Sequence, residues 1–212
     1  MKKIGIAMLI LAALLCACGK TGKAETAPAD PKTVAPLPAD LSLEELDNCV
    51  FAAAFESSDV YMSQGNLVIS LVPNYAPKYD REQVDALNPG DTLVLGGENV
   101  TVESVQRKAN HVAVNGGTEA GGFDLYLLDV GAYIQVIPDV GTVYAPLGVV
   151  TLCVDPSFVF TDNSDPQNQG LKISAGDFLL AMENRVDSFD ANATLVRTEN
   201  GCIVELTKEY LP

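Results

Sequence analysis

The sequence contains five cysteines and a single histidine, so thiol chemistry is the first reaction type to consider. A cysteine acts as a nucleophile when a neighbouring base or cation keeps it ionised at neutral pH. Beyond the N-terminal region the cysteines are Cys49, Cys153 and Cys202, and the imidazole is His111. Their spacing is neither C-x-x-C nor His-rich, which argues against a zinc site. Three cysteines allow at most one disulfide within a monomer.

One arrangement of these residues is typical of a known thiol enzyme. His111, then Thr151-Leu152-Cys153, then Arg185 or Arg197 follow the His, Cys, Arg order of sortases, which are β-barrel transpeptidases of the cell envelope. This resemblance implies a nucleophile at Cys153 and a base at His111, although the second threonine of the sortase motif is missing. The other two cysteines lack the flanking residues of L,D-transpeptidases and cell-wall endopeptidases. The leading interpretation makes Cys153 a buried, inert strand residue, and the thiol enzyme is the alternative.

The N-terminus carries an export signal. Two lysines at positions 2 and 3 precede an apolar run over residues 4–15, which is shorter than the roughly 20 residues that cross a bilayer as a helix. Leu15-Cys16-Ala17-Cys18 then resembles the lipobox of bacterial lipoproteins, Leu-x-(Ala/Gly)-Cys. The resemblance implies a signal peptide over 1–17 and acyl chains, such as palmitate, on Cys18. It predicts a protein anchored on the extracytoplasmic face of the cell membrane. Cys16 fits the motif badly because bulky Leu15 precedes it.

The charge balance narrows the choice of partners. The formal net charge is −15, and it becomes −17 when the two N-terminal lysines leave with the signal peptide. Nucleic acids need clustered Lys and Arg, so this composition argues against them and against electrostatic docking on an anionic membrane. Tryptophan, on which sugars commonly stack, is absent. A pair of glycosidase carboxylates has no specific support.

An acidic loop over residues 155–170 is the densest source of oxygen ligands in the chain. Asp155, Asp162 and Asp165 lie in it among asparagine, glutamine and serine, and Ca²⁺ takes 6–8 oxygen ligands. Pro166 occupies a position where an EF-hand would need a ligand, so that motif fails. A solvated loop built from turn-forming residues is the favoured interpretation, and a calcium site remains an open alternative. We predict no cofactor and no metal.

The composition predicts a linker followed by one body. Residues 18–40 contain four prolines and few large apolar residues, so we expect a flexible tether that is dispensable for folding. Residues 41–212 should form a mainly β domain, barrel- or sandwich-like, with a short helix or turn at 43–47 and a short helix at 80–87. Residues 49–55 fit a helix or a strand. Strands are expected at 67–72, 92–95, 100–106, 111–115, 123–128, 133–137, 149–154, 194–198 and 202–208.

Two short patterns bear on how the strands are connected. Asn200-Gly201 between the last two strands predicts a type I′ hairpin, because both residues accept positive φ. Residues 87–93 and 173–179 share an apolar-x-x-Gly-Asp-x-Leu pattern. Each segment is expected to precede a strand. Two related β-modules would explain the shared pattern, and so would two ordinary turns before strands.

Several motifs of the body resemble uncharacterised lipoproteins of Gram-positive anaerobes. They include Tyr79-Asp80, Gly90-Asp91-Thr92, Asn115-Gly116-Gly117 and the closing Asn200-Gly201-x-Ile203. These are turn and core positions, and the resemblance implies no activity. The sequence therefore predicts a non-enzymatic binding or structural module of the cell envelope, in contact with the membrane through its lipid and with envelope components through its body.

Overall fold

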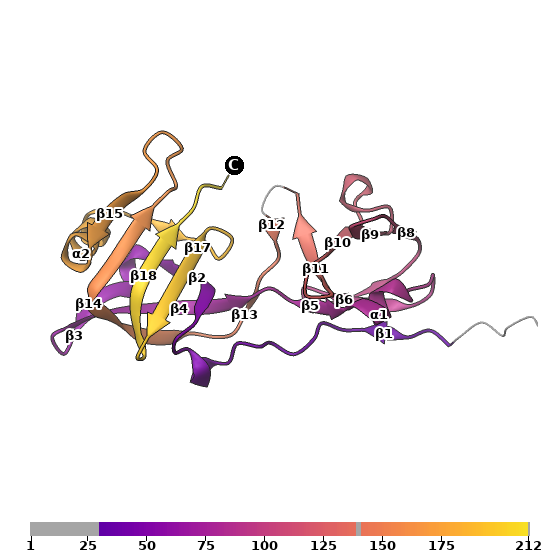
Figure 1. Cartoon of the computed structure of the whole chain (residues 1–212), viewed down its shortest axis with the longest axis horizontal. Coiled ribbons are helices and arrows are strands. Elements are labelled where there is room, and N and C mark those ends of the chain that lie inside the picture. The colour runs from indigo at the N-terminus through magenta and orange to yellow at the C-terminus, as the bar shows by residue number, and fades with distance from the viewer. Residues whose placement is uncertain (1–29, 139–140, 212) are drawn as a thin grey trace, which may run out of the picture. The chain divides into compact units, whose positions relative to one another are not determined.

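The computed structural model describes residues 30–138 and 141–211. It confirms a mainly β protein, with 49% of the described residues in strands and 13% in helices. The strands surround two hydrophobic cores, one built from residues 41–75 and 145–211 and the other from 31–37 and 78–142 (Figure 1). The region with the second core is an insertion between two strands of the first.

The first core is enclosed by a barrel of five strands. They are β2 (Val50–Glu56), β4 (Asn66–Tyr75), β14 (Val150–Asp162), β17 (Thr194–Glu199) and β18 (Cys202–Lys208). Strand β4 pairs with β14, β14 with β18 in parallel, β18 with β17, β17 with β2, and β2 with β4, which closes the barrel. This order, with a helix between the third and fourth strands, gives the five-stranded Greek-key architecture of an OB-fold.

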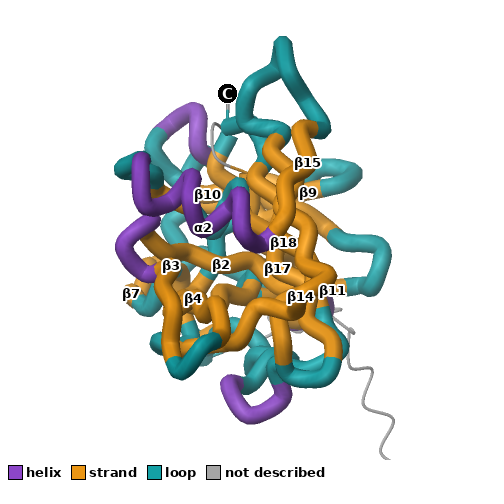
Figure 2. The backbone as a smooth tube through the Cα atoms, turned by 90° about the vertical axis from the view of Figure 1, so that its left-hand side faces the viewer, coloured by secondary structure: helices purple, strands orange, loops and turns teal. Residues whose placement is uncertain are grey.

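Short elements complete the barrel region. They are the 3₁₀ turns η1 (Leu43–Glu45) and η2 (Ser57–Asp59), strands β3 (Val60–Ser63), β13 (Ala145–Pro146), β15 (Leu171–Ser174) and β16 (Ser188–Phe189), and helix α2 (Ala175–Asn184). Figure 2 shows α2 lying over the barrel. The helix begins at Ser174, whose hydroxyl accepts a hydrogen bond from the Asp177 N–H. It buries Phe178 completely beside Phe158 and Phe160, so aromatic packing fills the barrel on this side.

The second core lies between two small sheets. One contains β1 (Thr33–Val34), β6 (Thr92–Leu95) and β7 (Glu98–Thr101). The other contains β5 (Lys78–Asp80), β8 (Val105–Arg107), β9 (His111–Val114), β10 (Phe123–Leu127), β11 (Ala132–Ile137) and β12 (Gly141–Thr142). Helix α1 (Arg81–Asp85) and the 3₁₀ turn η3 (Thr118–Ala120) connect strands. Burial raises the pKa of Tyr79 to about 12, so its phenol stays protonated and donates to the Val94 carbonyl oxygen.

The end of the predicted linker packs on this second core. The compact body begins at Pro31 rather than near residue 41, because Val34 in β1 is fully buried and pairs in parallel with Leu93. The Lys32 backbone N–H also donates to the side chain of buried Asp91. The prediction of a dispensable linker over 18–40 is therefore wrong for residues 31–40. One apolar side chain among prolines is enough to fix this segment when a pocket receives it.

Most strand predictions are confirmed, and the exceptions have local causes. Strands 92–95 and 202–208 agree to the residue, and 49–55 resolves into β2. The predicted strand 100–106 is two strands, because the side chain of Asn115 accepts the N–H groups of Glu103 and Ser104. Strand β14 continues past Pro156 to Asp162, and its register with β18 shifts between Val154 and Val159. Proline supplies no donor to a ladder, and a bulge accommodates it.

Helix α2 overturns the idea of two related modules. Gly90-Asp91 precedes strand β6, as expected, but Gly176-Asp177 lies inside α2. Buried Asp91 accepts backbone donors from Lys32 and Asn88, whereas Asp177 accepts the hydroxyl of Ser174 at the start of the helix. The shared pattern thus has two different structures. At 43–47 the expected short helix or turn is a 3₁₀ turn over Leu43–Glu45, in which the Ser42 side chain accepts no capping hydrogen bond.

The hairpin at Asn200-Gly201 has the predicted positive φ values, 52° and 76°, and joins the antiparallel strands β17 and β18. We expect Gly201→Val to lower the free energy of unfolding by about 1–2 kcal/mol, because a β-branched residue resists this conformation. A Cβ at position 201 meets no atom within 4 Å, so the cost is backbone strain. Urea denaturation measures it. Gly201→Asn, which tolerates positive φ, should retain most of the stability, and an equal loss in both variants would contradict this explanation.

Candidate functional site

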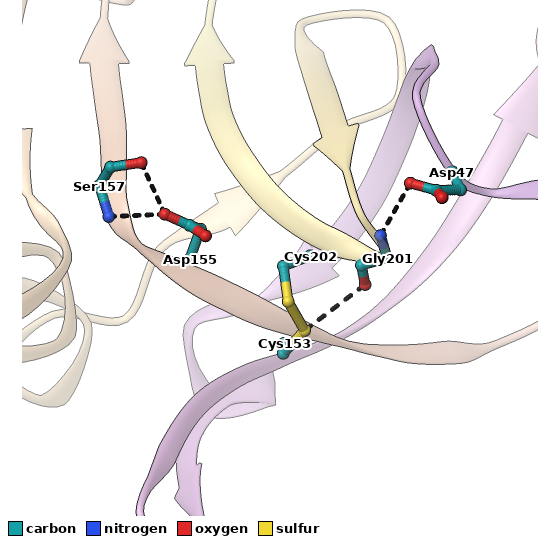
Figure 3. Close-up of a disulfide and its surroundings, with 6 residues drawn as sticks. All are labelled: Asp47, Cys153, Asp155, Ser157, Gly201 and Cys202. Carbon is teal, nitrogen blue, oxygen red and sulfur yellow. Dashed lines mark hydrogen bonds between the residues drawn. A yellow bond between two sulfur atoms is a disulfide. The ribbon is translucent and has the colours of Figure 1, made fainter.

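The proposed nucleophile Cys153 is joined to Cys202 by a disulfide (Figure 3). The two residues face each other in the parallel pair β14–β18, with Cα atoms 4.7 Å apart. Gly201, in the hairpin turn beside the disulfide, donates its N–H to the Asp47 side chain and so holds the turn in place. In this oxidised form Cys153 has no thiol to ionise, so it cannot attack a carbonyl. Cys153 is expected to be a buried, inert strand residue, but it is only partly buried, and it lacks a reactive thiol because it is bonded to Cys202.

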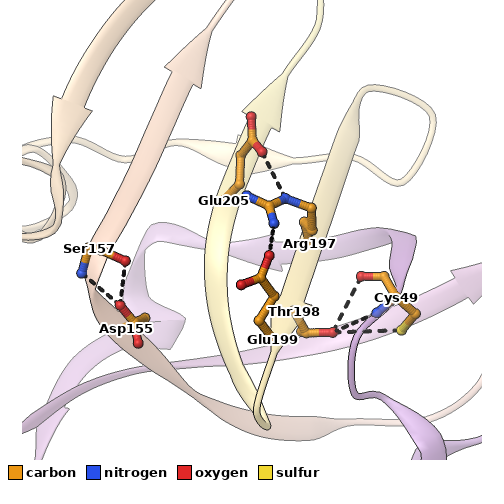
Figure 4. A network of polar contacts seen from close by, with 7 residues as sticks. All are labelled: Cys49, Asp155, Ser157, Arg197, Thr198, Glu199 and Glu205. Atoms are coloured by element: carbon orange, nitrogen blue, oxygen red, sulfur yellow. Dashed lines mark hydrogen bonds and ion pairs between the residues drawn. The ribbon is translucent and has the colours of Figure 1, made fainter.

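Cys49 keeps its thiol, among the residues that the structure describes. It precedes β2 and is half-buried against Thr198, whose hydroxyl lies 3.7 Å from Sγ and 3.4 Å from the Cys49 N–H (Figure 4). Arg197, which precedes Thr198 in β17, is paired with Glu205 at 3.0 Å and with Glu199. The Arg197 guanidinium is thus already paired with two carboxylates.

His111 lines a cavity in the region of the second core, and no cysteine lines that cavity. Its ring stacks on Tyr126 across strands β9 and β10, with centroids 4.8 Å apart, and Nδ1 is 3.0 Å from Asn110 Oδ1. Asp124 and Lys108 line the same cavity of about 380 Å³. Burial alone would raise the pKa of Asp124, but the hydrogen bonds from Thr118 and the charges of His111 and Lys108 lower it below its ordinary value. The structure does not bring His111 and Cys153 into one lining, so it gives the sortase-like arrangement no support.

The acidic loop is organised by its own turns. Asp162 Oδ1 accepts the N–H and hydroxyl of Ser164, at 2.9 and 2.6 Å. Asp165 accepts the Gln167 N–H and the Asn168 side chain, both at 2.8 Å. These are local Asx turns, and within residues 30–138 and 141–211 no group of three His, Cys, Asp or Glu is placed to hold a metal ion. The loop carries no metal site that we can assign.

A groove on the outer face of the barrel is the best candidate for a binding site. It runs along β4, and we call it the β4 groove. Its deeper part is a cavity of about 400 Å³ whose lining includes Glu56, Asp59, Ser70, Val72, Ser188 and Asp190. The cavity forms where β2 separates from β4. Residues 52–54 of β2 pair with β4, but Phe55 and Glu56 pair instead with β16.

The floor of this cavity belongs to the hydrophobic core and is therefore rigid. The rings of Phe55 and Phe189 stack in parallel, with centroids 4.2 Å apart, and both side chains are buried. Phe189 is packed in turn against Phe160 and Phe178. A floor held by an aromatic cluster needs little rearrangement when a ligand binds.

The shallower part of the groove is a row of three hydroxyl groups. Strand β4 pairs with β3 on one side and with β14 on the other (Figure 2). Tyr61, Ser70 and Thr151 point outward from these strands, because their alternate residues Val60, Ile69 and Leu152 face the core. The Ser70 hydroxyl lies 3.2 Å from the Tyr61 hydroxyl and 2.8 Å from that of Thr151. Ser70 also lines the cavity, so the row and the cavity are continuous.

The sequence did not reveal this groove, because its residues come from five separate segments of the chain. The serines, carboxylates and valines in it are ordinary surface residues when taken one by one. Ser70 is the one polar residue in the apolar run over residues 67–72, which is a signal that its side chain faces outward from the strand. Among the described helices, none is both long and apolar enough to cross a membrane. Comparisons with family models, curated proteins and solved structures find no match to this chain.

Proposed function

We propose that the protein is a lipid-anchored, extracytoplasmic protein of the bacterial cell envelope that binds an envelope component and catalyses no reaction. The lipobox and Cys18 lie outside the described residues, so the anchor rests on the sequence motif alone. Two acyl chains, at about 0.8 kcal/mol for each buried CH₂, anchor a protein durably where one chain does not.

The Cys153–Cys202 disulfide is the observation that carries the extracytoplasmic part of the proposal. Disulfides form and persist in oxidising compartments and are rare in a reducing cytosol. Two cysteines that are distant in sequence stand opposite each other in register between neighbouring strands, so the fold itself brings them together. A disulfide thus supports export independently of the N-terminal motif.

Two observations, one at Cys153 and one at the β4 groove, support a binding role over a catalytic one. The thiol chemistry that the sequence suggested lacks a free, activated nucleophile at Cys153. The β4 groove instead offers a rigid floor, hydroxyl groups and carboxylates on the outer face of the barrel. Pre-formed concave surfaces with a few polar groups are typical of ligand sites.

Lipidation is testable in a bacterial host supplied with labelled palmitate. We expect the full-length protein to incorporate the label and to fractionate with membranes, and Cys18→Ala to abolish both. Cys16→Ala is the matched control, because it changes a neighbouring cysteine that fits the lipobox badly, and it should be labelled normally. Label that persists in Cys18→Ala, or that disappears equally in the control, would overturn the assignment of the anchor.

A further inference from the structure

We propose that the β4 groove binds a neutral glycan chain. This inference rests on the proposed function in one respect: an exported protein meets polysaccharides at the cell surface. The argument otherwise depends on the groups that line the groove, on their charge and on their continuity.

The polar groups of the groove suit a ligand rich in hydroxyls. Glu56, Asp59 and Asp190 carry carboxylates, which accept hydrogen bonds and donate none. Ser70, Ser188 and the hydroxyl row both donate and accept. The carboxylates already accept hydrogen bonds within the protein, Glu56 from the Ser188 hydroxyl and Asp190 from the Asn192 N–H. An ionised carboxylate has about four acceptor sites in all, so sugar hydroxyls, which both donate and accept, can add further hydrogen bonds to it and to the hydroxyl row.

Apolar surface lies beside these polar groups, as the faces of a sugar ring require. Tyr61 is 42% exposed at one end of the hydroxyl row, and Val149, at the rim of the cavity, is 70% exposed. Val72 and Ala54 line the cavity between them. The C–H face of a sugar ring can lie on Tyr61 or Val149 while its hydroxyls reach the neighbouring carboxylates. Tyr61 thus supplies an aromatic surface in a chain without tryptophan.

The charge of the groove selects against polymers that carry phosphate or sulfate. Among the described residues that line the cavity, none is Lys, Arg or His, and the whole chain carries a net charge of −15. An anionic polymer placed here would bring its charges against three uncompensated carboxylates. The lining therefore favours a neutral polymer over an anionic one.

A cationic peptide is the rival ligand, because carboxylates also attract amines. The hydroxyl row favours the glycan, because its three neutral groups are linked by hydrogen bonds from Tyr61 through Ser70 to Thr151. These three hydroxyl groups offer a lysine-rich peptide no charge partner. The two ligands differ in salt dependence, since ion pairs at an exposed site weaken as the Debye length falls.

The test is calorimetric titration of the detergent-extracted full-length protein with defined probes. These are tetrasaccharides of β-1,4-linked N-acetylglucosamine, cellulose and starch type, a sulfated tetrasaccharide and pentalysine. We expect at least one neutral tetrasaccharide to bind, with a Kd that changes less than twofold between 50 and 500 mM salt, and the sulfated probe to bind at least tenfold more weakly. Failure of all neutral probes to bind below 1 mM, or salt-sensitive binding of pentalysine alone, would overturn the proposal.

Variants locate the bound glycan. Tyr61→Ala and Ser70→Val should each weaken binding at least tenfold, and Glu56→Gln, which keeps an acceptor oxygen, should weaken it less. Tyr210→Ala is the matched control, since Tyr210 is also exposed, by 49%, and lies outside the groove lining; it should bind as the wild type does. Undiminished binding by Tyr61→Ala and Ser70→Val would place the glycan elsewhere and refute the groove. Palmitate labelling of the same preparation tests the anchor separately.

Discussion

Replacing both Cys153 and Cys202 by alanine is expected to lower the free energy of unfolding by about 4 kcal/mol. The disulfide links residues that are 49 apart in sequence. Closing a loop of that length removes conformational entropy from the unfolded chain that is worth about 4 kcal/mol in the chain-entropy treatment. Total stability of a domain is typically 5–15 kcal/mol, so the loss would be a large share of it. Urea denaturation, followed by circular dichroism, measures the change.

The third cysteine provides the control for this experiment. Cys49→Ser removes a thiol that makes one long contact with Thr198 and should change the free energy of unfolding by less than about 1 kcal/mol. Adding a reductant should destabilise the wild-type protein and Cys49→Ser alike, and leave the double alanine variant unaffected. A double variant as stable as the wild type would show that the bridge contributes little to the folded state.

Removing residues 1–40 should destabilise the protein by about 3 kcal/mol relative to a chain that begins at Asp30. The shortened chain loses the burial of Val34, which contributes about 1.5–3 kcal/mol. It also leaves the Asp91 carboxylate, which is 5% exposed, without the Lys32 N–H donor, and an unsatisfied buried acceptor costs about 1–3 kcal/mol. Urea denaturation of the two chains, at equal concentration, compares them directly.

Single substitutions separate the side-chain contribution from that of the backbone. Val34→Ala should lower the free energy of unfolding by about 2 kcal/mol, because two buried methyl groups are lost. Val186→Ala is the matched control, since Val186 is fully exposed, and it should change stability by less than about 0.5 kcal/mol. If the two alanine variants were equally stable, β1 would not be packed in solution.

The sequence predicted elements best where the information was local. The strands at 92–95 and 202–208 are short runs rich in apolar and β-branched residues that follow clear turn signals, and the structure has them with the same ends. The hairpin at Asn200-Gly201 follows from two adjacent residues whose conformational preferences agree. In these segments the side chains that decide the backbone conformation lie within a few positions of one another.

Prediction failed where a distant partner decides the outcome. Val34 becomes a strand residue because Leu93, 59 positions later, receives it. Three cysteines allow three pairings, and only the register of β14 with β18 selects Cys153 and Cys202. Helix α2 was missed because Gly176 and the apolar residues around it also fit the start of a strand. The helical conformation is favoured by the burial of Phe178 against the barrel, which the local sequence does not reveal. The β4 groove depends on five segments at once.

Strand β1 also determines where mechanical tension on the proposed anchor would act. With Cys18 in the membrane, the chain from residue 19 to β1 can extend at most about 50 Å, whereas the whole segment 19–40 could extend about 70 Å. Strand β1 keeps the chain that follows it from extending through two residue pairs with β6, Thr33 with Thr92 and Val34 with Leu93. A pull on the lipid would load these pairs first. Their separation would lengthen the tether before force reaches the barrel strands.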